Sequence, residues 1–415
     1  MADWLDLDRR AIRRLEQCSI QYGRGPILAR IGRRCVAFVL HPDDVHRVLR
    51  ETPYPFASAT LEKRAALAHF EPKNVLLSEG AERAERRRWN EQALQPENPR
   101  HCHAGKFLQT ISAEIDTLQA KIAVRGELRW NDFSDAWFRI VLRVMFGDGA
   151  REDDELLETM ASLRRAANWA WLAPRQDRLL ARLLRRICEY LERAEPGSLA
   201  AMARDIEPLA DIAPEHQIPQ WLFAFDSTAT ATFRALALLA AHREYARGVR
   251  QEVESRGSAS DLPLTRSAVL ESLRLWPTTP LLLRETRVAT EWETGIMPPN
   301  TAIIIFTPFF HRNRYVDCAD RFAPQIWLKD AGLNQTPPVY WPSIPFSEGP
   351  GICPGRQVAL LMSTSVIAAI LERFRLRLKA PHILRAPLPG TLNHFSLSFE
   401  LRRLGAPRHS EHSNS

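Results

Sequence analysis

The amino-acid sequence predicts one large, mainly α-helical domain with a minor β component. Helical hydrophobic periodicity recurs along most of the chain, strand-like alternation is confined to short stretches, and neither a linker nor an internal repeat divides the elements. The pattern over 219–242 is apolar on most of the helix circumference, and such a helix normally runs through the middle of a large domain. We therefore expect one domain over 1–404, followed by a disordered tail over 405–415.

The N-terminal half mixes a short β region with successive helices. A short amphipathic helix comes first, and the apolar runs 27–32 and 35–40 then predict the two strands of a hairpin. A helix capped near its start follows over 41–51. Beyond it, apolar residues at three- and four-residue spacing predict further helices over 82–94, 105–124, 133–146, 152–171 and 175–193.

The C-terminal half changes from helices to strands and back again. Its central feature is a loop dense in proline and glycine over 342–355, directly before a strongly helical pattern. The remaining elements that we expect are helices over 243–255, 264–276 and 354–374, and strands over 281–295, 300–310, 375–380 and 394–404.

Composition excludes several classes of protein. The chain has 56 Lys and Arg against 49 Asp and Glu, and this small excess of mostly arginine fits an acidic protein partner better than nucleic acid. The six cysteines form no C-x-x-C pair, which argues against a disulfide framework and a zinc site. We find no stretch that is both long enough and apolar enough to span a bilayer, and we expect a cytoplasmic monomer.

The most informative stretch is the loop over 346–356, FSEGPGICPGR. Cys353 precedes a predicted helix, whose N-terminal N–H groups and positive partial charge favour a thiolate over a thiol. The glycines allow a flat group to approach the backbone closely. A lone cysteine is more often an inert residue of a turn, but the spacing F-x-x-G-x-x-x-C-x-G, formed by Phe346, Gly349, Cys353 and Gly355, is far more specific.

This spacing resembles the haem-binding motif of the cytochrome P-450 superfamily of haem-thiolate monooxygenases, and further motifs follow in the family's order along nearly the whole chain. The resemblance implies the cytochrome P-450 fold, with haem b between the long apolar helix and the helix after the cysteine loop. It makes Cys353 the axial ligand of the iron, whose thiolate favours O–O cleavage, and sets Phe346, Gly349 and Gly355 against the cofactor. The family often has a basic residue for a haem propionate where this chain has Gly351, so that contact comes from elsewhere or is absent.

Glu271 and Arg274 lie three residues apart on one face of a predicted helix. Such pairs are common at surfaces and matter little there, but upstream of the cysteine loop this one resembles the family's structural pair, which locks the fold behind the haem. The family's third partner is usually an arginine in a P-x-x-F/W segment, where this chain has Ile326. The sequence leaves three substitutes open: Arg321, His311 and Arg312.

Three arginines are candidates for binding the haem carboxylates. Arg83 and Arg87 lie four residues apart on one helix face, where the family often has histidine and arginine. Arg284 lies in a predicted strand whose arginine usually contacts the other propionate in the family. Guanidinium geometry suits carboxylates. In so arginine-rich a region, simple exposure to solvent is the alternative for each of them.

The long apolar helix departs from the family pattern. The motif A-G-x-[acid]-T aligns with Ala224–Thr228, where Phe225 replaces the glycine and Ser227 replaces the acid. Thr228, Ser227 and Asp226 are the catalytic candidates, because hydroxyl groups and ordered water can deliver protons. Asp226 comes one position early, and one residue rotates a side chain by about 100°, so we expect Thr228 and not Asp226 to control proton delivery.

Three functions remain open. The first is a monooxygenase that uses O₂ and electrons from a separate ferredoxin- or flavodoxin-type donor, because the chain has no flavin or iron–sulfur motif. This donor would dock over the Cys353 face, near Arg86, Arg88 or Arg356. The altered Ser227 motivates the second, a repurposed haem-thiolate enzyme for peroxide-driven oxidation, ring coupling, desaturation or isomerisation. The third is a haem-binding sensor or carrier without turnover.

The resemblance also implies where a small organic substrate lies. The segment 56–70 and three other stretches line the expected pocket, and they combine apolar side chains with a few hydroxyl and amide groups. That mixture suits a mainly apolar molecule held by one or two hydrogen bonds. The lining residues that we expect are Phe223, Ala224, Thr278, Thr279, Leu281, Leu282, Asn393, His394 and Phe395.

Overall fold

The computed structural model describes residues 7–207, 212–257, 261–328, 344–381 and 386–403. Helices make up most of this part of the chain and the strands gather in small sheets, so the predicted fold class, mainly α with minor β, is confirmed. The tail predicted over 405–415 lies outside the described residues.

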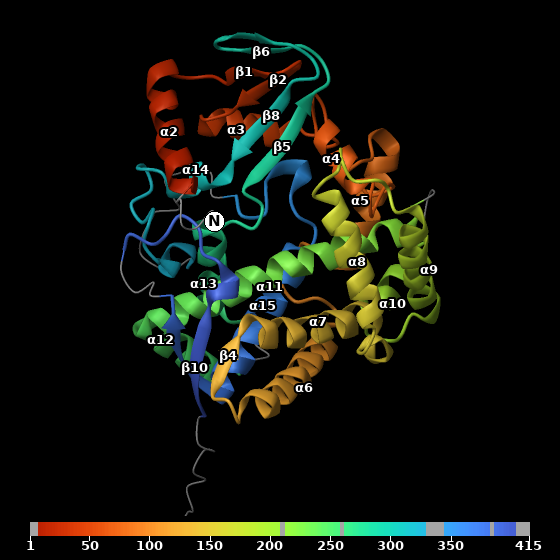
Figure 1. The fold of residues 1–415 in the computed structure, drawn as a ribbon, viewed down its shortest axis with the longest axis vertical. Coiled ribbons are helices and arrows are strands. Elements are labelled where there is room, and N and C mark those ends of the chain that lie inside the picture. Colours follow the sequence, from red (N-terminus) through yellow and green to blue (C-terminus); the bar gives the residue numbers. More distant parts are fainter. Residues whose placement is uncertain (1–6, 208–211, 258–260, 329–343, 382–385, 404–415) are drawn as a thin grey trace, which may run out of the picture.

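The helices recur in the order that hydrophobic periodicity predicts. The longest, α11 (Ile218–Ala241), crosses the middle of the molecule (Figure 1), and most of its side chains are buried because it is apolar nearly all round. The other helices are α2 (Leu7–Tyr22), α3 (Pro42–Arg50), α4 (Leu61–Leu67), α5 (Gly80–Leu94), α6 (Ala104–Ile122), α7 (Trp130–Phe146), α8 (Asp154–Ala167), α9 (Asp177–Arg193), α10 (Leu199–Arg204), α12 (Arg243–Arg256), α13 (Pro263–Leu275), α14 (Thr307–Arg312) and α15 (Arg356–Arg373).

The strands form three sheets. A five-stranded sheet has the order β1-β2-β8-β5-β3, in which β2 and β8 are parallel and the other pairs are antiparallel. A three-stranded sheet has the order β4-β10-β9, and β6 pairs with β7. The strands are β1 (Ile27–Ile31), β2 (Arg34–Phe38), β3 (Phe56–Ala57), β4 (Glu127–Arg129), β5 (Leu281–Thr286), β6 (Thr290–Trp292), β7 (Gly295–Met297), β8 (Ala302–Phe306), β9 (Phe374–Ala380) and β10 (Ser398–Arg403).

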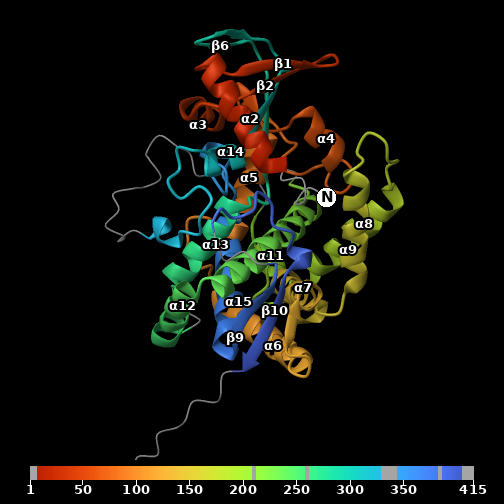
Figure 2. The same cartoon turned by 60° about the vertical axis from the view of Figure 1, so that its left-hand side comes forward.

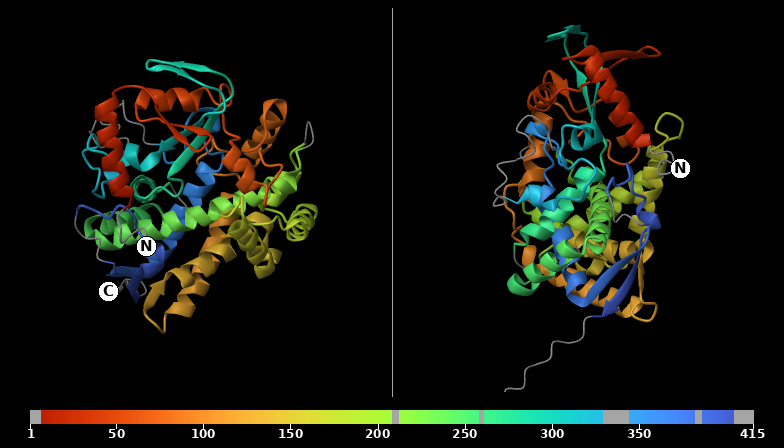
Figure 3. Two further views of the ribbon diagram at one scale, coloured as in Figure 1. Left: turned by 45° about the horizontal axis from the view of Figure 1, so that its top comes forward. Right: turned by 90° about the vertical axis from the view of Figure 1, so that its left-hand side faces the viewer.

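The sheets lie at opposite ends of the helical body. The five-stranded sheet and the β6–β7 hairpin lie at one end with α2 and α3, whereas β9 and β10 lie at the other end beside α6 (Figures 2 and 3). Each end has its own packing: the largest apolar core joins α5–α11, α13 and α15, and a second cluster lies beneath the five-stranded sheet. The cysteine loop packs against α3 at the sheet end and leads into α15, which packs against α11.

The predicted elements differ from the structure at a few boundaries. The strand expected over 300–310 ends at Phe306, because Pro308 cannot donate to a sheet ladder and instead sits in the first turn of α14. The helix expected over 152–171 ends at Ala167. The short helices α4 and α10 were not predicted, since neither is long enough to display a helical period.

One described helix is long and apolar enough to meet a simple criterion for crossing a membrane. It is the segment Pro214–Ala241, which contains α11, and 61% of its most apolar window is buried inside the fold. The core helix of a folded domain meets the same criterion, and α11 contributes to the main apolar core along most of its length.

Candidate functional site

The cysteine loop is a tight, hydrogen-bonded turn at the entrance to α15. The backbone N–H of Cys353 donates to the carbonyl of Phe346 at 2.9 Å, which closes the loop around Gly349–Gly351. Gly349 has a positive φ of 65°, and a side chain there would collide with the carbonyl of Leu49 on α3. The loop is therefore pressed against α3, and its conformation requires glycine at this position.

The surroundings of Cys353 act on its thiol in opposite directions. Burial raises the pKa of Cys353, whereas a backbone hydrogen bond from Gly355 and the charges of Arg87 and Arg356 lower it. The same groups would stabilise a thiolate that is bound to a metal cation, because the cation removes the cost of burying a bare negative charge. The arrangement is that of a thiolate ligand with hydrogen-bond support from the start of α15.

Helix α11 packs against α15, the helix that follows the cysteine loop, and the Thr232 hydroxyl of α11 donates to the Ser363 hydroxyl of α15 at 2.8 Å. On α11, which is largely buried, Ala224 is exposed, and Phe223, Asp226, Ser227, Thr228 and Thr230 are partly exposed. Helical geometry places Ala224, Ser227 and Thr228 on one face. The Thr228 hydroxyl donates to the carbonyl of Ala224 at 2.8 Å. Phe225 points elsewhere: it is 5% exposed, and its carbonyl accepts a hydrogen bond from Trp137 on α7. The open face therefore carries small side chains and two hydroxyl groups.

Asp226 lies on a different face of α11. Its carboxylate pairs with Arg164 of α8 at 2.8 Å, and the Arg164 guanidinium also lies 5.2 Å from the ring centre of Phe223. His394 is close enough for the Asp226 charge to act on it, although burial and Arg234 dominate and lower the pKa of His394 to about 4. Two predicted site residues, Phe223 and Asp226, thus meet at Arg164, for which the sequence carries no signal, and the Asp226 charge also reaches His394.

The predicted propionate arginines occupy two different surroundings. Arg284 is 4% exposed and donates to the Thr52 hydroxyl at 2.9 Å and to the carbonyl of Leu283. Burial and the nearby Arg83 lower the pKa of Arg284 to about 10. Among the described residues, neither Arg83 nor Arg284 forms an ion pair with a carboxylate. Arg87 differs, because it pairs with Glu91 at 2.6 Å on its own helix.

The space next to Gly351 explains the missing basic residue of the loop. A Cβ atom on Gly351 would lie 2.8 Å from Nη2 of Arg284, so the guanidinium occupies the position where a side chain from the loop would begin. Helix α5, which carries Arg83, is fixed against α11 by stacked Trp89 and Trp221 rings 5.4 Å apart. Arg83 and Arg284 are therefore buried cations with no carboxylate partner among the described residues. Arg284 lies next to the cysteine loop, in which the backbone of Gly355 forms a hydrogen bond with the thiol of Cys353.

This donor set fits a haem. A cysteine whose surroundings can support a thiolate and buried cations lacking an anion match the iron and the carboxylates of that cofactor. Cys353, Arg83 and Arg284 would hold it, whereas Gly349 is required by the packing of the loop against α3. Phe346 and Gly355 complete the loop through the backbone hydrogen bonds described above.

Glu271 and Arg274 form a buried bidentate pair. Arg274 Nε and Nη2 donate to the two carboxylate oxygens of Glu271 at 2.7 and 2.6 Å, and the two side chains are 2% and 0% exposed. Arg274 also donates to four backbone carbonyls in the segment 311–321. Glu271 accepts from the indole of Trp327 at 3.0 Å and from the N–H of Ala323 at 2.9 Å.

The third partner of the pair is therefore Trp327 and none of the three cations that the sequence left open. Arg312 pairs with Asp320 instead, and the side chain of Arg321 donates to the carbonyl of Asp317. His311 contributes only its backbone carbonyl to Arg274. Trp327 occupies the aromatic position of the P-x-x-F/W segment, and this was the signal in the sequence, because a tryptophan there supplies an indole N–H donor that phenylalanine lacks.

The remaining predicted residues are spread over three elements. Leu281 is 45% exposed at the start of β5, whereas Leu282 contacts the apolar cluster beneath the five-stranded sheet, so the two point to opposite faces. The carbonyl of Thr279, which follows Thr278 in the turn after α13, accepts a hydrogen bond from Thr307. The backbone N–H of Phe395 donates to the side chain of Asn393, and the rings of His394 and Phe395 lie 4.3 and 5.9 Å from that of Trp130.

One part of the predicted electron-donor face is wrong. Arg86 is 4% exposed and is held inside by Ser78 and Glu82, so it cannot meet a partner. Arg88 is partly exposed beside Glu85, and Arg356 pairs with Glu97. These two remain candidates for the face behind Cys353.

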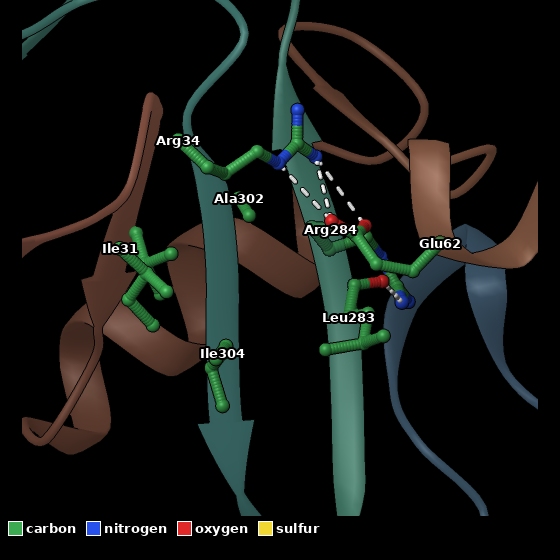
Figure 4. Close-up of a pocket in the computed structure, with 8 residues that line it drawn as sticks. Ile31, Arg34, Glu62, Leu283, Arg284, Ala302 and Ile304 are labelled. Atoms are coloured by element: carbon green, nitrogen blue, oxygen red, sulfur yellow. Dashed lines mark hydrogen bonds and ion pairs between the residues drawn. The ribbon is translucent and has the colours of Figure 1, made fainter. Parts of the chain in front are cut away.

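A small pocket lies away from the cysteine loop. It measures about 240 Å³ and lies over the five-stranded sheet, with the Arg34–Glu62 ion pair at its edge (Figure 4). Its lining includes Arg284 but no residue of α11 or of the cysteine loop. Apart from Arg284, it is separate from the site built from α11 and α15.

Comparison with known proteins agrees with this geometry. The cytochrome P-450 family model matches residues 201–391, which include α11, the Glu271–Arg274 pair and the cysteine loop. A cyclooctat-9-en-7-ol 5-monooxygenase of Streptomyces melanosporofaciens is 27% identical over 404 residues, covering 87% of this chain and 83% of that enzyme. Cytochrome P-450 4c3 of Drosophila melanogaster is 31% identical over 163 residues, but these span only 36% of this chain and 30% of the insect protein.

Solved structures extend the likeness to the whole fold. A cyanobacterial CYP120A1 with bound retinoic acid has a TM-score of 0.74 at 17% identity, with 94% of both chains covered. CYP102L1, another cytochrome P-450, has a TM-score of 0.76 at 19% identity, covering 95% of this chain and 94% of that one. The family-model match and the Streptomyces relative identify the chain as a member of the cytochrome P-450 superfamily and, at that level, as a haem-thiolate monooxygenase, and the solved structures show that it has the same fold.

Proposed function

We propose that this protein uses haem b to insert one oxygen atom of O₂ into a mainly apolar small organic molecule. The observation that carries the proposal is the pairing of the Cys353 loop with an α11 face that presents Ala224, Ser227 and Thr228. The substrate class is supported by the apolar side chains around this face and by the Streptomyces relative, whose name makes cyclooctat-9-en-7-ol its substrate. We propose a hydrocarbon-rich substrate with one or two hydroxyl groups, oxidised in secondary metabolism.

When bound through Cys353, haem supplies the O₂-activating redox chemistry. The protein's task on the opposite side is to hold the substrate, exclude bulk water and deliver protons. In the proposed role, the Thr228 hydroxyl rotates from the Ala224 carbonyl to orient a water molecule and pass on its proton. Ser227, on the same open face, is a second site for that water, whereas Asp226 is held by Arg164.

A repurposed haem-thiolate enzyme is the second candidate, and the Asp226–Arg164 pair favours it specifically. With Ser227 in place of the family's acid and Asp226 paired on another face, no carboxylate on the open face of α11 serves proton delivery among the described residues. Such a site would suit reactions that need fewer protons, including peroxide-driven oxidation, ring coupling, desaturation and isomerisation. A sensor without turnover is the least supported of the functions.

The proposed electron donor is a small acidic protein of the ferredoxin or flavodoxin type, meeting a cytoplasmic monomer. Its contact would be the face behind Cys353, where Arg88 and Arg356 lie at the surface of α5 and α15. Attraction between opposite charges speeds such encounters and weakens with salt. We therefore expect the rate of reduction by the donor to fall as ionic strength rises.

The test has two stages. The ferrous protein under carbon monoxide should show the red-shifted Soret band of thiolate-ligated haem, and Cys353→Ser should lose it; a histidine-type spectrum would refute haem-thiolate chemistry here. Turnover under isotopically labelled O₂, with a substrate found by spectral-shift screening, should then give a product with one labelled oxygen. Unlabelled product, or full turnover with peroxide alone, would favour the repurposed enzyme.

A further inference from the structure

Lys63 lies beside Arg284 in a part of the site that no sequence motif indicates. Lys63, on α4, donates from Nζ to the carbonyl of Leu283 at 3.3 Å. Arg284 donates from Nη1 to the same carbonyl at 2.9 Å (Figure 4). A single carbonyl oxygen thus holds two cations together, and the charge of Arg83 acts on both of them. Three positive side chains from α4, β5 and α5 therefore converge.

The nearest acidic residues do not neutralise this cluster. Glu62 and Glu285 are the sequence neighbours of Lys63 and Arg284, but both carboxylates pair with Arg34, at 3.0 and 2.6 Å (Figure 4 shows the Glu62 pair). Glu285 also pairs with Arg287 at 3.1 Å. No ion pair joins Lys63, Arg83 or Arg284 to a carboxylate in the part of the chain that the structure describes.

Such a cluster is electrostatically unfavourable by itself. Burial, followed by repulsion from Arg284 and Arg83, lowers the pKa of Lys63 to about 7, although the weaker attraction of Glu62 opposes the shift. Keeping all three side chains charged in these buried surroundings would be favoured by an anion that neutralises them. Two carboxylates on one rigid ligand would meet that requirement, and the thiolate loop next to Arg284 already fits a cofactor that carries two.

We propose that Lys63 binds a haem propionate and supplies the positive charge that the cysteine loop lacks at Gly351. The Arg284 guanidinium occupies the space next to Gly351, so a side chain there would have to displace it, and we place the missing cation on α4, where Lys63 reaches the carbonyl of Leu283. This inference rests on the proposed haem binding. It adds a binding residue outside the family motifs and ties the cofactor to α4.

The proposal predicts that haem retention depends on pH through Lys63. A bound carboxylate favours the charged lysine, so haem binding raises its pKa from the value of about 7. Haem then binds more tightly at low pH than at high pH, and this advantage is lost as the pH rises from about 7 toward the raised pKa of the bound lysine, so release accelerates on the alkaline side of neutrality. The charged groups that act on Lys63 are Arg284, Arg83 and Glu62.

The experiment compares haem release from the full-length holoprotein and its variants by transfer to excess apomyoglobin. Lys63→Met should release haem about tenfold faster, the lower bound for losing a charge-assisted hydrogen bond. Lys73→Met, at an exposed lysine ten residues along the chain, is the matched control and should match the parent. Lys63→Arg should keep haem release slow and make it less dependent on pH between pH 6 and 9. This variant tests the proposal even if Lys63→Met does not fold.

The decisive arm uses haem dimethyl ester, in which both propionates are capped. The parent and Lys63→Met should then release the cofactor at equal rates, because the lysine has no carboxylate to bind. Equal rates with ordinary haem, or an unchanged difference with the ester, would overturn the proposal. The carbon monoxide spectrum separates the two levels: loss of the thiolate band in the parent protein defeats haem-thiolate binding itself, whereas a normal band with unchanged release defeats only the role of Lys63.

Discussion

The two walls of the haem site differ in how their polar groups are satisfied. Behind the cysteine loop, Glu271 and Arg274 are almost completely buried, and each makes several hydrogen bonds to a neighbouring segment. On the opposite wall, α11 leaves Ala224 exposed, and its acid Asp226 turns outward to Arg164, with about a third of each side chain exposed. The first wall is a closed structural network; the second is open and adjustable. We therefore expect substitutions in the first wall to change stability and substitutions in the second to change the reaction.

The largest expected effect comes from breaking the closed network. Glu271→Ala should yield misfolded or haem-free protein, because it leaves the Arg274 charge buried without a partner, a loss of about 3–5 kcal/mol. Trp327→Phe removes only the indole hydrogen bond and should lower stability by less. Thermal unfolding and the haem content of purified protein measure both. Haem-replete Glu271→Ala with normal stability but reduced turnover would move this pair into the reaction site.

The same wall should make the protein sensitive to acid through His311. Burial, and then Arg274, lower the pKa of His311 to about 3, and its Nε2 accepts the N–H of Ile344 at the start of the cysteine loop. The unfolded chain takes up this proton below about pH 6.5 and the folded chain does not, so stability falls as the pH falls from 6.5 toward 3, by at most about 1.4 kcal/mol per pH unit.

Replacing His311 by glutamine checks this pH dependence. The amide oxygen of His311→Gln can still accept the Ile344 N–H, but it cannot titrate, so the free energy of unfolding should vary less between pH 6.5 and 4. His394, whose pKa burial and Arg234 lower to about 4, acts in the same direction and is replaced separately for comparison. An unaltered slope in His311→Gln would show that the loop contact is not proton-linked.

A smaller effect distinguishes the two predicted propionate arginines. Arg284 has no described carboxylate partner, whereas Arg87 is already paired with Glu91, so Arg284→Gln should increase haem loss more than Arg87→Gln. Loss of a charge-assisted hydrogen bond corresponds to about 1.5–3 kcal/mol for Arg284. Haem-transfer rates measure the difference, and the carbon monoxide spectrum should keep its thiolate band in both variants. A larger effect from Arg87 would reverse this assignment of roles.

The closed wall was also the more predictable one from sequence. The spacing around Cys353 and the i, i+3 pair Glu271–Arg274 are local patterns, and the periodicity of α11 and α15 gave their extent within a few residues. Trp327 was missed because the pattern led us to look for a cation at position 326. Lys63 and Arg164 could not be found, since each owes its role to the packing of elements distant in sequence: α4 against β5, and α8 against α11.

The smallest effect tests the open wall itself. Thr228 lies on the open face of α11, where its hydroxyl can hold water. Thr228→Ala should therefore uncouple the reaction and divert about tenfold more reductant to hydrogen peroxide. This effect is somewhat smaller than the rate loss that follows removal of a general acid. Thr230→Ala is the matched control, because that hydroxyl donates to the Asp226 carbonyl of the same helix. The ratio of product to reductant consumed, measured with a turned-over substrate, reports the difference.

Asp226 and Ser227 complete that test. Asp226→Asn should leave coupling nearly intact, because the carboxylate serves the half-exposed pair with Arg164, whose loss lowers stability by about 0.2–1 kcal/mol. Ser227→Asp restores an acid on the open face and should keep or raise the coupled rate if O₂ activation is the native chemistry. If Thr228→Ala couples as well as the parent and Ser227→Asp is inert or harmful, proton delivery does not limit this site. The open wall would then serve a reaction other than oxygen insertion.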